Sequence, residues 1–422
     1  MGADVPVASP QLQRNLSMTD RTTAFFAPRM SRFKPSPSQM ASARVRELVA
    51  EGKDIVKLTA GEPDFPTPDI AKAAALAVMD ANEIRYTPIN GLEEMRKAAQ
   101  HKFKRDNNLH YDLDQITVGS GTKQVLFNAL MCSVSSGDEV IVPGPYWSSY
   151  PDMVALAGGT PVIVDCDRAS SFKMSPAQLD AAITEKTKWL MFSSPSNPTG
   201  ATYSRAHLKA LTEVLLAHPH VHVMSDDVYE HLIFDGREFG TFAEIEPRLY
   251  DRTLTCNGVS KAYSMTGWRV GFAGGPRDII SNLSKMQSQS TAGVNAVGQG
   301  AAAAALLGPI DEVLERTQNL QSRRDLLFDA LSQVPELQCE RPEGAMYIFC
   351  SCAGAIGKRT PTGKLIENDT DFVMYLLDSV GVAVVQGSAY GLSPYFRASF
   401  VATEADITRG GKLIREACAA LS

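Results

Sequence analysis

Lys261 is the side chain in this sequence with the clearest potential for covalent chemistry. It closely follows an apolar run at residues 253–257 and is surrounded by small residues rather than by other charges. A lysine in desolvating surroundings loses its proton readily and can form a Schiff base with an aldehyde. Arg269, eight residues later, could supply a neighbouring cation and clamp a phosphate. A single lysine is far more often a solvated surface residue, so the prediction depends on the residues that accompany it.

Two acids and a tyrosine follow another apolar run, residues 221–225. Asp226 comes directly after this run, Asp227 is next, and Tyr229 lies two residues further on. A buried carboxylate is costly unless it meets a cation, and a protonated pyridine nitrogen is such a cation. A solvated loop is the plainer interpretation, more so for Asp227 than for Asp226. Two adjacent acids could also bind a metal, but no histidine or further acid at ligand spacing supports this, so no metal is predicted.

Three further turns carry residue types that suit a flat, phosphorylated ligand. At residues 119–123 glycines lead from a strand into a helix, where backbone N–H groups and the helix dipole would hold a phosphate. Trp147 could stack on a heteroaromatic ring, and closely spaced prolines would hold Asn197 toward a ligand in a rigid turn, with a cis peptide as one option. Plain turns and a core tryptophan are the alternatives. If there is no ligand site here, all of these plainer interpretations must be correct at the same time.

The elements that must position these residues form an alternating pattern. Short apolar runs alternate with amphipathic segments between about residues 62 and 308, which predicts a mostly parallel sheet wrapped by helices. Ligands of such sheets collect beyond the carboxyl ends of the strands, where the chemical residues lie. Helices are expected over 93–105, 123–132, 205–217 and 310–333. The predicted strands are residues 116–119, 139–142, 161–164, 189–192, 221–225, 253–257 and 269–273.

The composition is typical of a globular protein that binds small molecules. The chain has 422 residues, of which 44% are hydrophobic and 21% charged, and its formal net charge is −6. This charge argues against nucleic-acid binding. The longest apolar stretch, residues 301–307, is far shorter than the roughly 20 residues of a membrane helix, so no membrane span is predicted.

Seven scattered cysteines favour a reduced, cytoplasmic compartment over a disulfide framework. Cys350 and Cys352 lack the second pair that a metal site would need, and we interpret both as ordinary small residues. The predicted domain boundaries are a flexible extension at 1–28, a first part of a small domain at 29–61, a large domain at 62–308 and the rest of the small domain at 309–422.

From about residue 30 to the C-terminus the sequence resembles the class-I aminotransferases that depend on pyridoxal 5'-phosphate (PLP), specifically the bacterial type of aspartate aminotransferase. The resemblance implies the type I fold of PLP-dependent transferases, with a seven-stranded, mostly parallel sheet in a large α/β domain and a smaller α+β domain. The matching stretches are LTAGEPDFPTP, RYTPINGLEEMRKA, TVGSGTKQVLFNAL, GDEVIVPGPYWSSYPDM, SPSNPTGA, SDDVYEHL, NGVSKAYSMTGWRVGF, PEGAMYIF and SPYFRASF.

The resemblance implies a role for each residue around the cofactor ring. Lys261 would be the Schiff-base lysine and, once freed, the base that carries a proton between substrate and cofactor. Asp226 would pair with the pyridine nitrogen and keep the ring an electron sink. Tyr229 and Asn197 would hydrogen-bond the 3'-oxygen, and Trp147 would stack on the ring.

The same resemblance implies how the phosphate is held. The backbone amides of Gly121, Thr122 and Lys123 would bind it together with Arg269. The partner's Tyr86 would reach it across the interface of a homodimer, which places the active sites at that interface. Gly258 stands where some relatives have a phosphate-binding serine, so one contact is missing or comes from elsewhere, with the partner's Ser290 as a candidate.

For the amino-acid and 2-oxo-acid substrates, the resemblance implies that Arg397 grips the α-carboxylate as a bidentate fork. Gly61 would approach the same carboxylate through its backbone, and Trp147 and Asn197 would also line the substrate site. Lys123 would read the distal carboxylate of aspartate. Lys34 matches a lysine of members that also convert prephenate to arogenate, or it is a solvated loop lysine.

The expected reaction is transfer of the amino group of aspartate to 2-oxoglutarate. A PLP-dependent β-elimination or decarboxylation is the alternative on the same fold. A transcription regulator with an aminotransferase-like sensor domain is a third interpretation. The segment before Arg29 is too short for the DNA-binding region of such a regulator.

Overall fold

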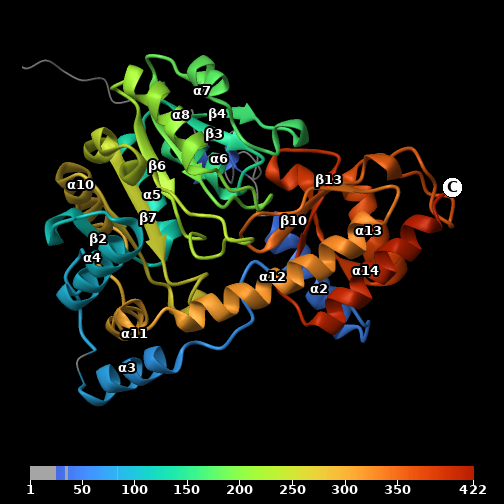
Figure 1. Cartoon of the computed structure of the whole chain (residues 1–422), viewed down its shortest axis with the longest axis horizontal. Coiled ribbons are helices and arrows are strands. Elements are labelled where there is room, and N and C mark those ends of the chain that lie inside the picture. The colour runs from blue at the N-terminus through green and yellow to red at the C-terminus, as the bar shows by residue number, and fades with distance from the viewer. Residues whose placement is uncertain (1–24, 34–36, 83) are drawn as a thin grey trace, which may run out of the picture.

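The computed structural model of the protein describes residues 25–33, 37–82 and 84–422. Figure 1 shows a central sheet flanked by helices and, beside it, a second group of helices and short strands formed mainly by the C-terminal part of the chain. The long helix α12 (Asp311–Ser332) runs from one group to the other. The extension predicted over 1–28 falls almost entirely outside the described residues.

The larger sheet has seven strands in the order β2-β8-β7-β6-β5-β3-β4. β8 is antiparallel to β2 and β7, and the remaining pairs are parallel, so the prediction of a mostly parallel seven-stranded sheet is confirmed. Each predicted strand is present within two residues at either end. The strands are β2 Ile116–Gly119, β3 Glu139–Gly144, β4 Thr160–Asp165, β5 Thr187–Ser193, β6 His222–Asp226, β7 Thr253–Gly258 and β8 Gly271–Gly274.

Helices cover both faces of this sheet, which explains why its strands are continuous apolar runs. Alternate residues of one strand enter different cores: Trp189 and Met191 pack with α5, α6 and α10, whereas Leu190 and Phe192 pack with α7 and α8. The helices of this part of the chain are α3 Asp69–Asp80, α4 Glu93–Asn107, α5 Thr122–Ser133, α6 Ser149–Ala157, α7 Pro176–Ala182, α8 Arg205–Ala217, α9 Phe242–Ile245, α10 Arg277–Ser288 and α11 Ala296–Leu307.

The second group is built on two small sheets. A four-stranded antiparallel sheet has the order β12-β13-β10-β9, and β1 pairs in parallel with β11, which brings the N-terminal segment against the C-terminal part of the chain. The strands are β1 Val56–Lys57, β9 Gln338–Cys339, β10 Tyr347–Ser351, β11 Val382–Ala383, β12 Val385–Gln386 and β13 Tyr395–Ser399. The helices, besides α12, are α2 Pro37–Ala50, α13 Asp369–Val380 and α14 Glu404–Ala419.

The strand predicted to begin at Arg269 begins two residues later, at Gly271. Arg269 instead ends a short 3-10 helix, Thr266–Trp268, and has a left-handed backbone with φ of 55°. This conformation turns its guanidinium back toward the carbonyls of Ser120 and Thr266, at 3.3 and 2.9 Å. The arginine is therefore held at the start of α5 rather than in the sheet.

The interpretation of Cys350 as an ordinary small residue is wrong. Cys339 of β9 and Cys350 of β10 stand directly opposite each other, with a Cα–Cα distance of 4.4 Å, and are joined as a disulfide. The other five cysteines are free. The pair was missed because its two members meet only through strand register.

A thiol titration tests this pair. Denatured protein purified without reductant is expected to show five reactive thiols, the five free cysteines, and seven after reduction. The variant C339S should show six in both states, since it leaves Cys350 without a partner. Seven reactive thiols before reduction, in protein kept under air, would contradict the pairing.

Candidate active site

A cavity of about 750 Å³ lies between the two groups of elements. The larger sheet contributes residues at and just beyond the carboxyl ends of its strands, among them Ser193 at the end of β5 and Asp226 at the end of β6. The smaller sheet contributes Tyr347 from β10 and Arg397 from β13. This is the position at which parallel α/β sheets bind ligands.

Asp226 is a buried carboxylate whose two oxygens have different surroundings. The hydroxyl of Tyr150 donates to Oδ2 at 2.6 Å, while Oδ1 has no hydrogen-bond partner among the described residues. Burial raises the pKa of Asp226 to about 6, even though the Tyr150 hydrogen bond works in the opposite direction. An unpaired buried oxygen on an acid that lines a cavity is suited to meet a cationic N–H group of a ligand.

Asp227 is not a solvated loop residue. It is 2% exposed, and burial raises the pKa of its carboxyl group to about 7. Its Oδ1 accepts a hydrogen bond from Ser225 at 2.6 Å, so it faces the body of the protein rather than the cavity. The sequence did not distinguish the two acids clearly because adjacent residues of a strand end point to opposite sides.

The cavity contains one connected group of side chains, which are Tyr229, Tyr347, Asn197 and Arg397. The hydroxyls of Tyr229 and Tyr347 lie 3.1 Å apart, and Nη1 of Arg397 donates to Oδ1 of Asn197 at 3.0 Å. Burial, followed by the neighbouring Tyr347, raises the pKa of Tyr229 well above its ordinary value, so its hydroxyl stays a hydrogen-bond donor. The turn of Asn197 contains two cis peptides, before Pro195 and before Pro198, so the cis option is confirmed.

Arg397 is a nearly buried cation that is held in a fixed orientation. Its guanidinium lies over the rings of Tyr347 and Tyr390, with 4.2 and 5.0 Å to the ring centroids, and Nη2 donates to the carbonyl of Thr59 at 3.1 Å. The guanidinium therefore lies within cation–π distance of two aromatic rings. No carboxylate pairs with it among the described residues, so its charge is available to an anionic ligand.

Lys261 projects into the same cavity. Its Nζ donates to the carbonyl of Gly61 at 2.5 Å and lies 5.8 Å from the centroid of the Tyr229 ring. Gly61 comes from the segment after β1, so the lysine bridges two distant parts of the chain. Among the described residues its ammonium has no acidic partner in an ion pair, which leaves it free for covalent chemistry.

The glycine turn before α5 fits closely around Arg269. Gly121 has φ of 82°, and a Cβ at this position would lie 2.4 Å from Nη2 of Arg269, so only glycine fits. The N–H of Gly121 donates to the carbonyl of Gly119 at 2.8 Å. The amides of Thr122 and Lys123 begin the helix and have no carbonyl four residues earlier to bond, which suits them to an anion.

Gly258 is explained by the same turn. A Cβ there would lie 2.6 Å from Oγ1 of Thr122, which donates to the carbonyl of Asn257 at 2.9 Å. A serine side chain at position 258 would therefore collide with the Thr122 side chain. The hydroxyl of Thr122 occupies the space that a serine would need. Ser290 donates to carbonyls of its own helix end, at 3.3 and 3.5 Å.

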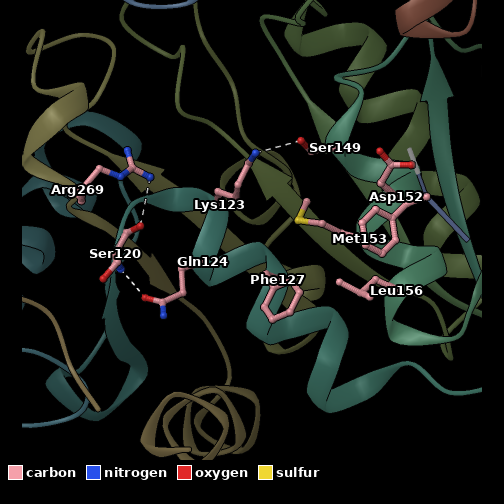
Figure 2. Close-up of a pocket in the computed structure, with 10 residues that line it drawn as sticks. Ser120, Lys123, Gln124, Phe127, Ser149, Asp152, Met153, Leu156 and Arg269 are labelled. Carbon is pink, nitrogen blue, oxygen red and sulfur yellow. Dashed lines mark hydrogen bonds between the residues drawn. The ribbon is translucent and has the colours of Figure 1, made fainter. Parts of the chain in front are cut away.

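Lys123 lies at the boundary between this cavity and a second cleft of about 350 Å³ (Figure 2). Its Nζ is 4.5 Å from the centroid of Trp147 and donates to Oγ of Ser149 at 3.1 Å. Burial, then the charges of Arg269 and Lys261, lower its pKa. The second cleft runs between α5 and α6, with Arg269 at one end and Asp152 at the other.

The fold brings most of the predicted site residues together. The cavity is lined by ten of them: Gly61, Thr122, Lys123, Trp147, Asn197, Asp226, Tyr229, Lys261, Arg269 and Arg397. Gly121 lies beside Arg269. Tyr86 is 98% exposed and is not among the cavity residues, and Lys34 lies outside the described residues. Two further cavity residues, Tyr150 and Tyr347, were not predicted, because they follow no strand end and have no distinctive spacing in the sequence.

The residues present fit PLP in three respects. The unpaired Oδ1 of Asp226 matches a protonated pyridine nitrogen. The amides at the start of α5 and the guanidinium of Arg269 match a phosphate. Lys261 has the reactive amine that an aldehyde requires, and it lines the same cavity as Asp226.

The comparison with protein families agrees with this chemistry. The model of the family "Aminotransferase class I and II" matches residues 53–412, and the chain belongs to this family. The protein is therefore a transaminase with the fold of the aspartate aminotransferases, whose structures it matches over nearly its whole length.

Two curated relatives illustrate the similarity. The aspartate aminotransferase of Rhizobium meliloti (strain 1021) is 50% identical over 396 residues, which cover 94% of this chain and 97% of the relative. The aspartate/prephenate aminotransferase of Cereibacter sphaeroides (strain ATCC 17029 / ATH 2.4.9) is also 50% identical over 396 residues, with the same coverage.

Solved structures give the same result. The aspartate aminotransferase from Rhizobium meliloti has a TM-score of 0.92 at 49% identity, covering 94% of this chain and 99% of that one. The aspartate aminotransferase from Thermus thermophilus with maleate has a TM-score of 0.87 at 35% identity, covering 93% and 99%. Within the described residues, none of the helices combines the length and apolar character that crossing a membrane requires.

The raised pKa of Asp226 predicts how the cofactor-free protein responds to pH. Because the folded state disfavours the ionised carboxylate, the cost is absent below about pH 4, grows between pH 4 and 6, and is complete above pH 6. D226N should therefore stabilise the cofactor-free protein at pH 8 by up to about 3 kcal/mol. Urea unfolding at pH 8 and pH 5 measures this. A variant with no larger gain at pH 8 than at pH 5 would contradict the assignment.

Proposed function

We propose that the protein is a PLP-dependent aminotransferase that moves the amino group of L-aspartate to 2-oxoglutarate, giving oxaloacetate and L-glutamate. The observation that carries the proposal is the presence of Lys261, the half-paired carboxylate of Asp226 and the unpaired guanidinium of Arg397 in one cavity. These are the three groups needed for an aldehyde, a pyridinium and an α-carboxylate. The relatives named aspartate aminotransferase support the choice of amino acid.

When bound, PLP supplies an electron sink that makes the substrate Cα–H bond acidic. Asp226 would keep its pyridine nitrogen protonated by offering Oδ1, while Tyr150 holds Oδ2. The amides of Thr122 and Lys123 with Arg269 would hold its phosphate. Gly121 provides the close approach that this requires.

Lys261 would move the proton between the substrate Cα and the cofactor. Its amine must first be released from the Gly61 carbonyl, to which it donates at 2.5 Å. Tyr229, whose pKa is raised by burial, would donate its hydroxyl to the ring oxygen, and Asn197 would do the same through its amide. Trp147, which lines the same cavity, would stack on the ring.

Recognition of a dicarboxylic substrate would use two cations at opposite ends. Arg397 would bind the α-carboxylate as a fork, exchanging its present contact with Asn197 for the ligand, and the backbone at Gly61 would close on the same group. Lys123, next to Trp147 and Ser149, would bind the distal carboxylate. The Thermus thermophilus relative was solved with maleate, a small dicarboxylate, which supports this arrangement.

Residues 62–308 would form a large cofactor domain, and 29–61 with 309–422 a small domain that carries Arg397. Substrate binding by Arg397 would then draw the small domain over the cavity and exclude water. We place the enzyme in the cytoplasm, in keeping with small water-borne substrates.

The active enzyme would be a homodimer with its sites at the subunit interface. Tyr86 is 98% exposed, and α3 beside it exposes Ile70, Leu76 and Met79, an apolar face that a second copy would cover. The cleft of Figure 2 reaches Ser120 and Arg269, next to the proposed phosphate site. The partner's Tyr86 would enter there and complete the phosphate contacts.

Prephenate is a second candidate substrate. Relatives of similar identity are named aspartate/prephenate aminotransferase. Lys34 would contribute to this activity, and it lies outside the described residues. The reaction would give arogenate, and it would use the same Lys261 and Arg397.

Absorbance tests the main proposal. Protein supplied with PLP should show a band near the visible edge that bleaches when aspartate is added and returns with 2-oxoglutarate. The variant K261A should lose aspartate-dependent turnover by a factor of at least about 1,000, because it removes the covalent anchor and the proton carrier together. R397K, which keeps the charge but loses the fork, should raise the KM for aspartate more than it lowers kcat.

Product analysis separates transfer from the alternatives. Glutamate and oxaloacetate in equal amounts support the proposal, whereas alanine would indicate decarboxylation and ammonia would indicate elimination. Wild-type protein without any visible band after PLP addition would overturn it.

An assay with prephenate tests the second candidate. Purified enzyme given prephenate and either glutamate or aspartate should form arogenate, and K34A should lower this rate more than the rate with oxaloacetate. If an enzyme that is active on aspartate forms no arogenate, prephenate is excluded as a substrate and the main proposal is unaffected.

A further inference from the structure

The turn after β6 divides its side chains between two sides. Asp226 and Tyr229 line the cavity, whereas Glu230 and His231 point away from it. Glu230 is only 5% exposed, which is unusual for an acidic side chain. Nothing in the proposed chemistry uses it, so its burial calls for a different explanation.

Glu230 is fixed by a closed set of contacts with the C-terminal end of α4. Its Oε1 forms a short ion pair with Nζ of Lys102, and its Oε2 accepts from Nδ2 of Asn107 at 2.8 Å. Lys102 in turn donates to Oδ1 of Asn107 at 2.6 Å. All three side chains are buried, and together they form a triangle in which each member contacts the other two.

His231 extends this triangle to a second acid. Its Nε2 lies 3.1 Å from Oε1 of Glu230 and 3.3 Å from Oδ2 of Asp106, and Asp106 is paired with Arg105 at 2.6 Å. Burial would lower the pKa of His231, but Glu230 and Asp106 raise it above its ordinary value. The two acids thus favour the protonated imidazole, which lies within contact distance of both.

The trio Asp106, Glu230 and His231 has the composition of a metal site, with ligand atoms within 4.8 Å of one another. Lys102 and Arg105 already neutralise both carboxylates, however, and an ion would have to displace them. The cluster is better explained as a set of protein charges that satisfy one another.

Buried ion pairs add little net stability, but they fix geometry, because each partner has a narrow range of acceptable positions. Tyr229 is the residue next to Glu230, and Asp226 lies four residues before it on the same turn. Moving the Glu230 carboxylate would therefore move the Tyr229 hydroxyl. A second anchor acts on the same turn from α12, where Oγ1 of Thr317 donates to the His231 carbonyl at 2.9 Å.

We propose that Glu230, held by Lys102 and Asn107, is a positioning residue that sets where the Tyr229 hydroxyl and the free oxygen of Asp226 meet the cofactor ring. The inference rests on the proposed function, since it assigns the cluster a role toward PLP. Glu230 does not line the cavity, so it acts only through the turn.

The variant E230Q tests the proposal, because it removes the charge while keeping the size and one acceptor for Asn107. The pH midpoint of the visible band in PLP-loaded enzyme should rise by about half a unit or more, since a displaced Tyr229 donates less well to the ring oxygen and leaves more negative charge beside the titrating proton. The kcat for aspartate should fall roughly tenfold or more, with KM changed less than about twofold.

E246Q is the matched control. Glu246 is also 5% exposed and paired with Lys209 and Arg248, but it lies at the end of α9 and is not among the cavity residues. E246Q should lower the melting temperature without moving the midpoint. N107A serves as the second variant if E230Q does not fold, since it loosens the triangle while leaving Lys102 and Glu230 paired, and it should move the midpoint in the same direction.

The outcomes are distinct. A raised midpoint in E230Q or N107A, with none in E246Q, supports the positioning role. Variants that melt earlier but keep the wild-type midpoint and kcat show that the cluster is only structural and overturn it. Wild-type enzyme without a visible band overturns the proposed function itself, and this inference with it.

Discussion

The burial of the Asp226 carboxylate is the constraint on which the rest of the site depends. A carboxylate with one unpaired oxygen is unfavourable in a protein interior unless a ligand completes it. The fold tolerates it because β6 lies in the middle of the seven-stranded sheet, and Tyr150 satisfies the other oxygen. A cationic ligand would complete this carboxylate, and the cavity lies at this strand end, which is where a parallel sheet has room for a ligand.

The Asp226 carboxylate would repel the anionic groups of a ligand. These groups must therefore bind at a distance from Asp226 and next to cationic side chains. The site achieves this by drawing its cations from different elements. Arg269 is turned back onto the start of α5, Lys123 is in α5, and Arg397 comes from β13 of the smaller sheet. The position of Arg397 on a separate group of elements would give substrate binding, as proposed, a direct way to close the cavity.

The turn after β6 is held in place by contacts with neighbouring helices. This turn belongs to no helix or strand. It is fixed by ionic contacts with α4 and by Thr317 of α12. Buried charges in such a place are acceptable only when they are fully paired. Lys102, Asn107 and Glu230 meet this condition because each contacts the other two.

The sequence by itself determined the seven strands and the residues that follow them. Strands covered on both faces are continuous apolar runs, so their ends, and with them Asp226 and Lys261, can be found from local pattern. Tertiary structure decided which side of a turn each residue faces, and so separated Asp226 from Asp227. It also decided which residues become partners, because such contacts produce no recognisable pattern in the sequence. Tyr150 meets Asp226 from a distant segment, and Cys339 meets Cys350 through the register of two paired strands.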